Sequence, residues 1–358
     1  MYTALNAADT EKIERAGMEE VQKKNVARIK LVILIVLPIA AFILSFTIGR
    51  YAITLPQLGE TILSHIWGNE MVQQDNLDTV VFNIRLPRII AAMLVGAALS
   101  CAGAAYQGMF RNPLVSPDIL GASAGAGFGA CLAIYFSTSV AVIQITAFAF
   151  GLAAVGLACL INAKLDYDPI LGLVLGGILI SSLFSAASSA IKYLADANDK
   201  LPEITFWLMG SLSSINQRDT LSILLPMIIG FILLFIFRWR INVLAFGEEE
   251  ARSLGVNTKR LRFIVIVAST LLSASAVSIC GMIGWIGLVI PHLGRALAGP
   301  DYRILMPVTA VLGGTYLLLM DDLARCLGSV EIPLGILTAI FGIPFFVIIF
   351  KQNVKGER

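Results

Sequence analysis

About ten apolar segments, separated by short polar breaks, dominate this chain. Most of them approach or exceed the roughly 20 residues that an α-helix needs to cross a bilayer. Backbone groups find no water inside a membrane, so apolar runs of this length predict helices that satisfy their own hydrogen bonds. The segments fall near residues 31–50, 88–110, 117–136, 140–162, 169–191, 220–237, 263–283, 284–298, 304–320 and 333–350. The sequence therefore predicts an all-α, polytopic membrane protein of about ten transmembrane helices.

Composition excludes several other classes of protein. Hydrophobic residues make up 57% of the chain and charged residues 14%, whereas soluble domains carry about a quarter charged residues. The net charge of +2 gives no argument for a nucleic-acid partner. Five cysteines without C-x-x-C or zinc spacing, and only two histidines, predict neither a metal site nor a cofactor. A G-x-x-x-x-G-K-[ST] phosphate loop is missing, so any ATP hydrolysis must occur in another chain.

Lysine and arginine gather on one side of the predicted spans, which the positive-inside rule makes the cytoplasmic side. A polar tail at residues 1–30 ends in a basic cluster, and residues 351–358 form a second basic tail. An even number of spans places both tails in the cytoplasm, on either side of one transmembrane domain at residues 31–350. The largest insert on this face is the segment 238–262. The chain is thus predicted to be a multi-pass protein of the cell membrane.

Three arginines do not follow this charge distribution. Arg85, Arg88 and Arg325 all lie at the predicted outer ends of spans. One interpretation is snorkelling or a local ion pair, for which Asp321 and Arg325 have the i, i+4 spacing. The other interpretation is a basic outer rim that receives an acidic partner. The residues alone leave both open.

The insert 238–262 contains a predicted short helix outside the membrane. Glu248, Glu249 and Glu250 favour the positive N-terminal end of a helix dipole, and Gly255 suits its C-terminal end. A short helix rich in both charges suits docking to a soluble subunit. The alternative is a solvated connector.

Small residues recur every four positions inside two of the spans. Gly96 to Gly108 form one such series, and Gly121, Gly125 and Gly129 form another. This spacing lets membrane helices approach closely, because lipid supplies no hydrophobic drive for their association. We interpret these glycines as packing residues rather than as a phosphate-binding loop.

Two rival functional classes remain open. The residues around Ser123 match the G-x-S-x-G pattern of a hydrolase, but that motif needs a strand-turn-helix setting and a histidine partner. An ion-coupled carrier needs ionisable groups in its pathway, and few lie deep in the predicted spans. Both classes are less favoured than a transport subunit driven by another chain.

Several motifs, in order along the chain, resemble the FecCD-type permeases. They cover nearly everything after the N-terminal tail. They are RLPR at 85–88, GAAL at 96–99, QGMFRNPL at 107–114, GASAGAG at 121–127, GWIGLVIPH at 284–292, DLAR at 322–325, EIPLG at 331–335 and GIPFF at 342–346. This family includes importers of iron-siderophores, haem and cobalamin.

The resemblance implies a permease subunit of an ABC importer in a bacterial or archaeal inner membrane. It implies pairing with a second copy or a paralogue, two cytoplasmic ATP-binding subunits and an extracytoplasmic substrate-binding protein. No residue of the permease itself is expected to be catalytic. The implied cargo is an iron-siderophore or a related metal chelate, with haem, cobalamin or an oxyanion such as molybdate as alternatives.

The resemblance also assigns roles to particular positions. In the family, outer arginines receive glutamates of the binding protein, and the matching residues here are Arg85, Arg88 and Arg325. The resemblance therefore favours the docking interpretation for all three arginines. The family's ATPase-coupling helix matches the positions Glu248, Glu249, Glu250, Ala251, Leu254 and Gly255.

Family members narrow their inner gate at the turn between the fourth and fifth spans. Here that turn contains Asp166, Tyr167 and Asp168, where the cobalamin relative has small hydroxyl residues. We expect Tyr167 to narrow the exit. The alternative is an ordinary turn closed by Pro169.

Overall fold

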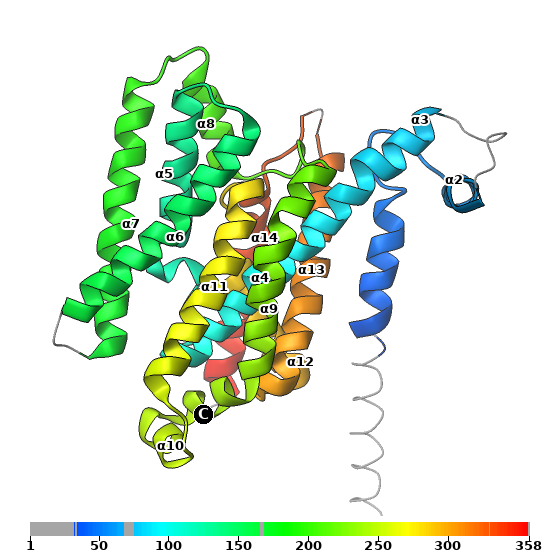
Figure 1. Ribbon diagram of the computed structural model, residues 1–358. Helices are drawn as coiled ribbons and strands as arrows, with labels where there is room; N and C mark the ends of the chain where they lie inside the picture. Colours follow the sequence, from blue (N-terminus) through cyan, green and yellow to red (C-terminus); the bar gives the residue numbers. More distant parts are fainter. Residues whose placement is uncertain (1–31, 33, 68–74, 165–167, 329, 357–358) are drawn as a thin grey trace, which may run out of the picture.

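The computed structural model describes residues 32, 34–67, 75–164, 168–328 and 330–356, and within these ranges every regular element is helical (Figure 1). The elements are the helix Leu34–Ser45, α2 (Leu55–Trp67), α3 (Asp75–Asp78), the π-helical η2 (Thr79–Arg85), α4 (Leu86–Phe110), the 3-10 helix η3 (Pro117–Leu120), α5 (Ala122–Tyr135), α6 (Val140–Lys164), α7 (Pro169–Leu194), α8 (Lys200–Met209), α9 (Gln217–Phe246), α10 (Glu248–Ser253), α11 (Thr258–Cys280), α12 (Ile286–Ala298), α13 (Tyr302–Cys326) and α14 (Leu334–Gly356). The predicted all-α class is confirmed.

Among the described residues, ten apolar helices correspond one to one with the ten predicted segments. Six are long and apolar enough to cross a membrane: the continuous stretch Asn76–Phe110, α6, α7, α9, α11 and α13. Four shorter apolar helices accompany them, namely Leu34–Ser45, α5, α12 and the stretch Leu334–Ile348 of α14. Sequence reasoning missed α2 and α8, because neither contains an apolar run of membrane-spanning length. The second span also begins earlier than predicted, at Asn76 rather than near residue 88.

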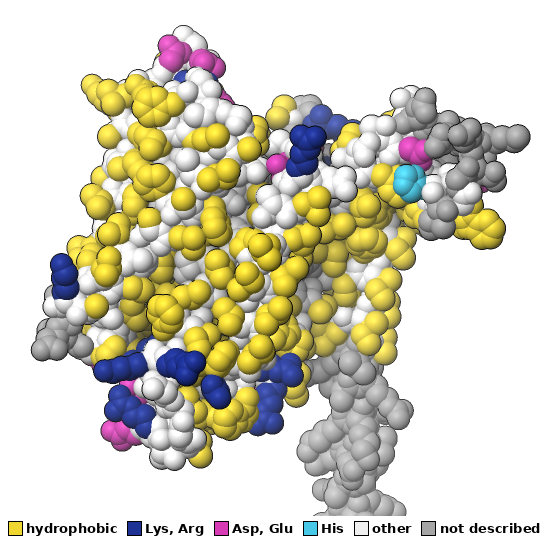
Figure 2. Space-filling view, in the orientation of Figure 1, with side chains coloured by type: hydrophobic (Ala, Val, Ile, Leu, Met, Phe, Trp, Pro, Cys, Tyr) yellow, Lys and Arg dark blue, Asp and Glu magenta, His cyan; other side chains and the backbone are white. Residues whose placement is uncertain are grey.

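Two helices, α4 and α11, form the centre of the bundle. They pack against each other, and most residues of both are buried. By contrast, most residues of α6, α7 and α9 are not buried, and hydrophobic side chains cover the flank of the molecule (Figure 2). A soluble protein rarely exposes so large an apolar surface. The perimeter helices therefore offer apolar surface to lipid or to another subunit, and α4 and α11 are shielded from both.

Close contacts at glycines bring the central helices together. A Cβ atom on Gly96 would overlap with the carbonyl oxygen of Gly313 in α13, and one on Gly103 would overlap with that of Gly287 in α12. Gly125 and Gly129 of α5 meet backbone carbonyls of α6 in the same way. The interpretation of these glycines as packing residues is confirmed, since a side chain would force the helices apart.

Candidate functional site

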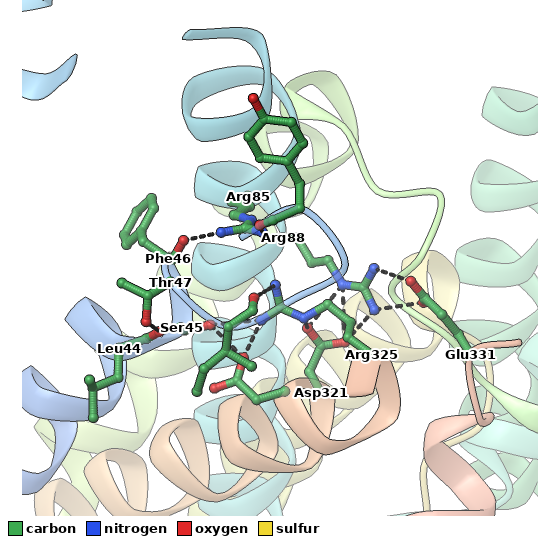
Figure 3. Close-up of polar contacts among 12 residues, drawn as sticks. Leu44, Ser45, Phe46, Thr47, Arg85, Arg88, Asp321, Arg325 and Glu331 are labelled. Atoms are coloured by element: carbon green, nitrogen blue, oxygen red, sulfur yellow. Dashed lines mark hydrogen bonds and ion pairs between the residues drawn. The ribbon is translucent and has the colours of Figure 1, made fainter. Parts of the chain in front are cut away.

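Three arginines converge where α4 begins and α13 ends (Figure 3). Arg85 is the last residue of η2, Arg88 lies in the first turn of α4, and Arg325 lies in the last turn of α13. Their exposed fractions are only 4%, 6% and 6%. The structure therefore gathers the three sequence-predicted arginines into one cluster, but it places them beneath the surface rather than on an open rim.

Two carboxylates hold the guanidinium of Arg88. Its Nε and Nη2 donate to Asp321 at 2.9 and 2.8 Å, and its Nη1 and Nη2 donate to Glu331 at 3.1 and 2.8 Å. Such paired hydrogen bonds match the planar fork of arginine to a carboxylate. Asp321 belongs to α13 and Glu331 to the segment between α13 and α14, so Arg88 connects three parts of the chain.

Arg325 connects α13 to the first helix. Its Nε lies 3.4 Å from Asp321 Oδ2, which confirms the i, i+4 ion pair predicted from the spacing. Its Nη2 donates to Ser45 Oγ at 2.8 Å and to Asp322 Oδ1. Ser45 closes the helix Leu34–Ser45 and donates to the same Asp322 oxygen at 2.6 Å. The ion pairs of α13 thus fix the end of the neighbouring helix.

Arg85 is bound by backbone oxygens rather than by acids. Its Nη1 donates to the carbonyl of Phe46 and its Nη2 to that of Tyr51. Gly49 lies between these residues with φ +144°, and a Cβ atom there would stand 2.9 Å from Arg85 Nη2. The absence of a side chain at Gly49 therefore lets segment 46–51 fold around the guanidinium.

Acidic side chains offset the positive charge of the cluster, to which Arg50 also contributes near Glu331. Three arginines face three acids, of which Asp321 is fully buried and Asp322 is 5% exposed. Buried charges are tolerated when they are paired and hydrogen-bonded, as they are here. Burial alone would raise the pKa of Glu331, but the hydrogen bonds from Arg88 and its positive charge hold that pKa below its usual value. Any acidic partner at this end meets arginines that already have carboxylate or carbonyl partners.

The opposite end of the bundle carries α10, surrounded by Lys and Arg side chains (Figure 2). The short helix is present, and Gly255 follows it with φ +77°, as the sequence predicted. Ala251 is fully buried against the bundle, while Leu254 is 63% exposed. Glu249 and Glu250 are exposed as well. The helix is anchored by one face and offers both acids and an apolar side chain to solvent.

Glu248 differs from the two acids that follow it. It accepts hydrogen bonds from Arg252 at 2.6 Å, from Thr258 at 3.0 Å and from Arg262. Burial would raise the pKa of Glu248, but these hydrogen bonds, that of Arg262 foremost, lower it below its usual value. Since Thr258 and Arg262 belong to α11, Glu248 ties α10 to a central helix of the bundle.

The predicted gate is only partly covered by the structure. Asp166 and Tyr167 lie outside the described residues. Asp168 is exposed and accepts hydrogen bonds from the backbone N–H groups of Ile170 at 2.7 Å and Leu171 at 3.2 Å. These bonds make Asp168 the N-cap of α7.

Ser123 lies in a setting unlike that of a hydrolase nucleophile. It is in the first turn of α5, after the 3-10 helix η3, and its Oγ donates to Asp118 Oδ1. The strand-turn-helix arrangement that a nucleophile elbow requires is replaced here by two successive helices. The hydrogen bond from Ser123 to Asp118 therefore connects α5 to η3.

Sequence reasoning missed the partners of the charged residues it selected. Ser45, Asp322 and Glu331 complete the arginine cluster, and Arg262 completes the contacts of Glu248. EIPLG and DLAR were noted as motifs, but no local spacing connects Glu331 to Arg88, 243 positions earlier. A compensating acid could have been sought on general grounds, because buried arginines need counter-charges.

The fold and the two charged ends define a multi-pass membrane transport subunit. Residues 34–352 match the FecCD transport family, and the chain belongs to that family. It is an ABC transporter permease of the inner membrane rather than an enzyme, because ATPase activity in this family lies in separate subunits.

Relatives of the chain are named for different transported substrates. The chain is 42% identical over 317 residues to the molybdate import system permease protein MolB of Haemophilus influenzae, covering 88% of this chain and 93% of MolB. It is 40% identical over 302 residues to a "probable iron chelatin transport system permease protein" of Helicobacter pylori, covering 84% and 91%. A solved structure described as "an inward-facing conformation of a putative metal-chelate type ABC transporter" superposes with a TM-score of 0.81 at 39% identity, covering 91% of this chain and 99% of the other.

Proposed function

We propose that this chain forms the translocation pathway of a binding-protein-dependent importer for an iron-siderophore or a related metal chelate. It acts as a dimer with a second copy or a paralogue. Two ATP-binding subunits attach at the α10 end, which is the cytoplasmic side, and a substrate-binding protein docks at the end where the arginines gather. The family match over residues 34–352 carries this proposal. The choice of cargo is supported by the name of the Helicobacter pylori relative, a "probable iron chelatin transport system permease protein", and by the solved structure described as a "putative metal-chelate type ABC transporter".

The ATPase contact consists of the exposed face of α10. Glu249, Glu250 and Leu254 are exposed and accessible to a partner, and the carboxylate of Glu250 lies over Gly247 at the start of the helix. Glu248 transmits the movement of α10 that the ATPase causes, because its hydrogen bond to Arg262 connects α10 to α11. α11 packs against α4 in the centre of the bundle. A displacement of α10 is therefore transmitted directly to the buried helices that shape the pathway.

The binding protein docks over the cluster of Arg85, Arg88 and Arg325. Carboxylates are the natural partners of buried arginine forks, and complementary charge would speed the encounter of the two proteins at low salt. We also propose that the turn predicted at Asp166, Tyr167 and Asp168 forms the inner gate, with Tyr167 narrowing the exit.

Molybdate is the second candidate cargo. The 42% identity to the Haemophilus influenzae molybdate permease favours it, since that relative matches over most of both chains. The two cargos differ in size and chemistry, so a direct comparison of their uptake separates them.

Assembly is the first test. Glu249→Lys with Glu250→Lys should lower the amount of cognate ATPase that co-purifies with the permease, while Glu60→Lys on α2 at the other end should not. An unchanged yield would make α10 a solvated connector.

Docking is tested separately. Arg85→Glu with Arg325→Glu should weaken binding-protein affinity sharply, whereas Arg218→Glu, an exposed arginine at the start of α9, should have a smaller effect. ATPase co-purification serves as the folding control. Unchanged affinity for the double variant would remove the docking claim.

A further inference from the structure

The acids that neutralise the arginine cluster differ in how readily an outside group can replace them. The side chains of Asp321 and Asp322 are 0% and 6% exposed, and both belong to the rigid α13. The side chain of Glu331 is 25% exposed and comes from the segment that joins α13 to α14. Glu331 is therefore the member of the cluster that a partner is best placed to reach and displace.

The hydrogen-bonding capacity of Arg88 is almost completely used. Asp321 occupies Nε and one N–H of Nη2, and Glu331 occupies the other N–H of Nη2 and one of Nη1. A guanidinium offers five N–H donors in a fixed plane. A carboxylate that arrives from outside forms the same bidentate contact only by taking the place of one that is already bound.

Exchange of Glu331 for another carboxylate has a low free-energy cost. Arg88 would keep Asp321 and gain the new acid, so no buried positive charge is left unpaired. Glu331 is already partly in water, and its release exposes it further without burying an unpaired charge. Displacement of Asp321 would leave both Arg88 and Arg325 short of a partner.

Release of Glu331 would also reach other helices. Glu331 lies just before Leu334, the first residue of α14, whose backbone N–H donates to the carbonyl of Gly210 at 2.9 Å. Gly210 follows α8, and the next residue, Ser211, donates from its N–H to the carbonyl of Cys280 at the end of α11 at 2.8 Å. The start of α14 is thus hydrogen-bonded to the end of α8, and the residue after that end is hydrogen-bonded to the end of α11.

We propose that Glu331 is an internal stand-in for a carboxylate of the acidic partner protein, which displaces it from Arg88 on docking and so frees the start of α14. This inference rests on the proposed docking function. An acidic side chain of the partner would bind at the surface over Arg88 and Glu331. Docking would then change the contacts of α8, α11 and α14 in addition to attaching the partner.

The test compares binding-protein affinity across variants of the full-length permease, purified with its ATPase in nanodiscs. Glu331→Gln removes the competing charge and should bind roughly fivefold tighter at low salt. Arg88→Gln should bind more weakly, and Glu60→Gln, an exposed acid on α2 at the same end, should leave affinity unchanged. Tighter binding is a result that a merely structural role for Glu331 does not give.

Each of the other outcomes would contradict either the exchange of Glu331 or the docking itself. Weaker binding by Glu331→Gln would overturn the exchange, because the acid would then support docking. Unchanged affinity for Glu331→Gln with weaker binding by Arg88→Gln would also overturn the exchange but leave docking intact. Unchanged affinity for both variants would refute docking itself.

A second measurement keeps the wild-type Glu331 in place. Val330 is 73% exposed, so Val330→Cys in a Cys326→Ser background gives a reactive thiol beside Glu331. Its labelling rate should change when the binding protein is added. A constant rate in the docked complex would overturn the proposal.

Discussion

Asp321→Asn tests whether the buried ion pairs stabilise the bundle. The substitution keeps the shape of the side chain but removes the charge that faces Arg88 at 2.8 Å and Arg325 at 3.4 Å. Removal of one partner from a buried pair costs about 3–5 kcal/mol, because the remaining charge is uncompensated. Arg88 retains Glu331 and Arg325 retains Asp322, so we expect the lower end, about 3 kcal/mol. That is a large part of a total stability of about 5–15 kcal/mol.

Thermal unfolding in detergent, followed with a thiol-reactive dye, measures this loss. Cys101, Cys131 and Cys280 are free and buried, so they react only as the bundle opens, and Cys159→Ser with Cys326→Ser removes the two thiols that are partly or fully exposed. A loss of about 3 kcal/mol corresponds to a fall in Tm of roughly 4 °C for a chain of this size, because the entropy of unfolding grows with chain length. Asp199→Asn, which removes an acid that is 74% exposed, should leave the Tm unchanged.

Equal Tm values for Asp321→Asn and Asp199→Asn would refute the reasoning. The arginines would then be solvated in the membrane-embedded protein, and the self-neutralised cluster would not exist. An intermediate fall of 1–2 °C would mean that the cluster is hydrated, since hydration weakens ion pairs to about 1 kcal/mol or less.

Three further predictions concern packing and coupling. Gly103→Val should abolish monodisperse protein in size-exclusion chromatography, because a Cβ atom at this position overlaps a carbonyl oxygen of α12. Gly156→Ala is the control, since Gly156 faces open space and the substitution should be tolerated. Equal yields of the two variants would contradict the close packing of α4 and α12. Glu248→Gln should keep the ATPase attached but lower the amount of substrate transported per ATP hydrolysed, whereas Glu249→Gln should leave that ratio unchanged. Identical ratios for the two variants would contradict the separate role of Glu248. Because the folded-state pKa of Glu248 is lowered, its pairing with Arg262 contributes above the ordinary pKa of about 4.3 and is lost only as pH falls through the lowered value. The protection factors of the α10 amides, which are exchange rates corrected for the intrinsic rate at each pH, should therefore be equal at pH 7 and pH 5, and lower protection at pH 5 would contradict the pairing.

Much of the fold was predictable because the bilayer imposes a length and a polarity on each span. Segments such as 140–162 and 304–320 need no knowledge of their neighbours to be identified as helices. The short helix α10 was likewise predictable, since three acids and Gly255 are local signals of a helix start and end. The i, i+4 pair of Asp321 and Arg325 was visible for the same reason.

The arrangement of the arginine cluster was not predictable from local pattern. Arg88 meets Asp321 across 233 positions and Glu331 across 243, so only the packed bundle brings them together. Apart from the spacing of Asp321 and Arg325, the sequence gave no sign that acids neutralise these arginines, and none that Asp321 and Glu331 pair with Arg88. Glu248 shows the same limit, because its distinction from Glu249 depends on Arg262 in the next helix.

ATP-dependent uptake in proteoliposomes tests the central claim most directly. The permease, its cognate ATPase and its binding protein are reconstituted together, with labelled iron-siderophore, molybdate, haem and cobalamin offered in parallel. We predict uptake that requires all three components and ATP, with the iron-siderophore or a related metal chelate as cargo. Uptake by the permease alone, driven by an ion gradient, would contradict the account.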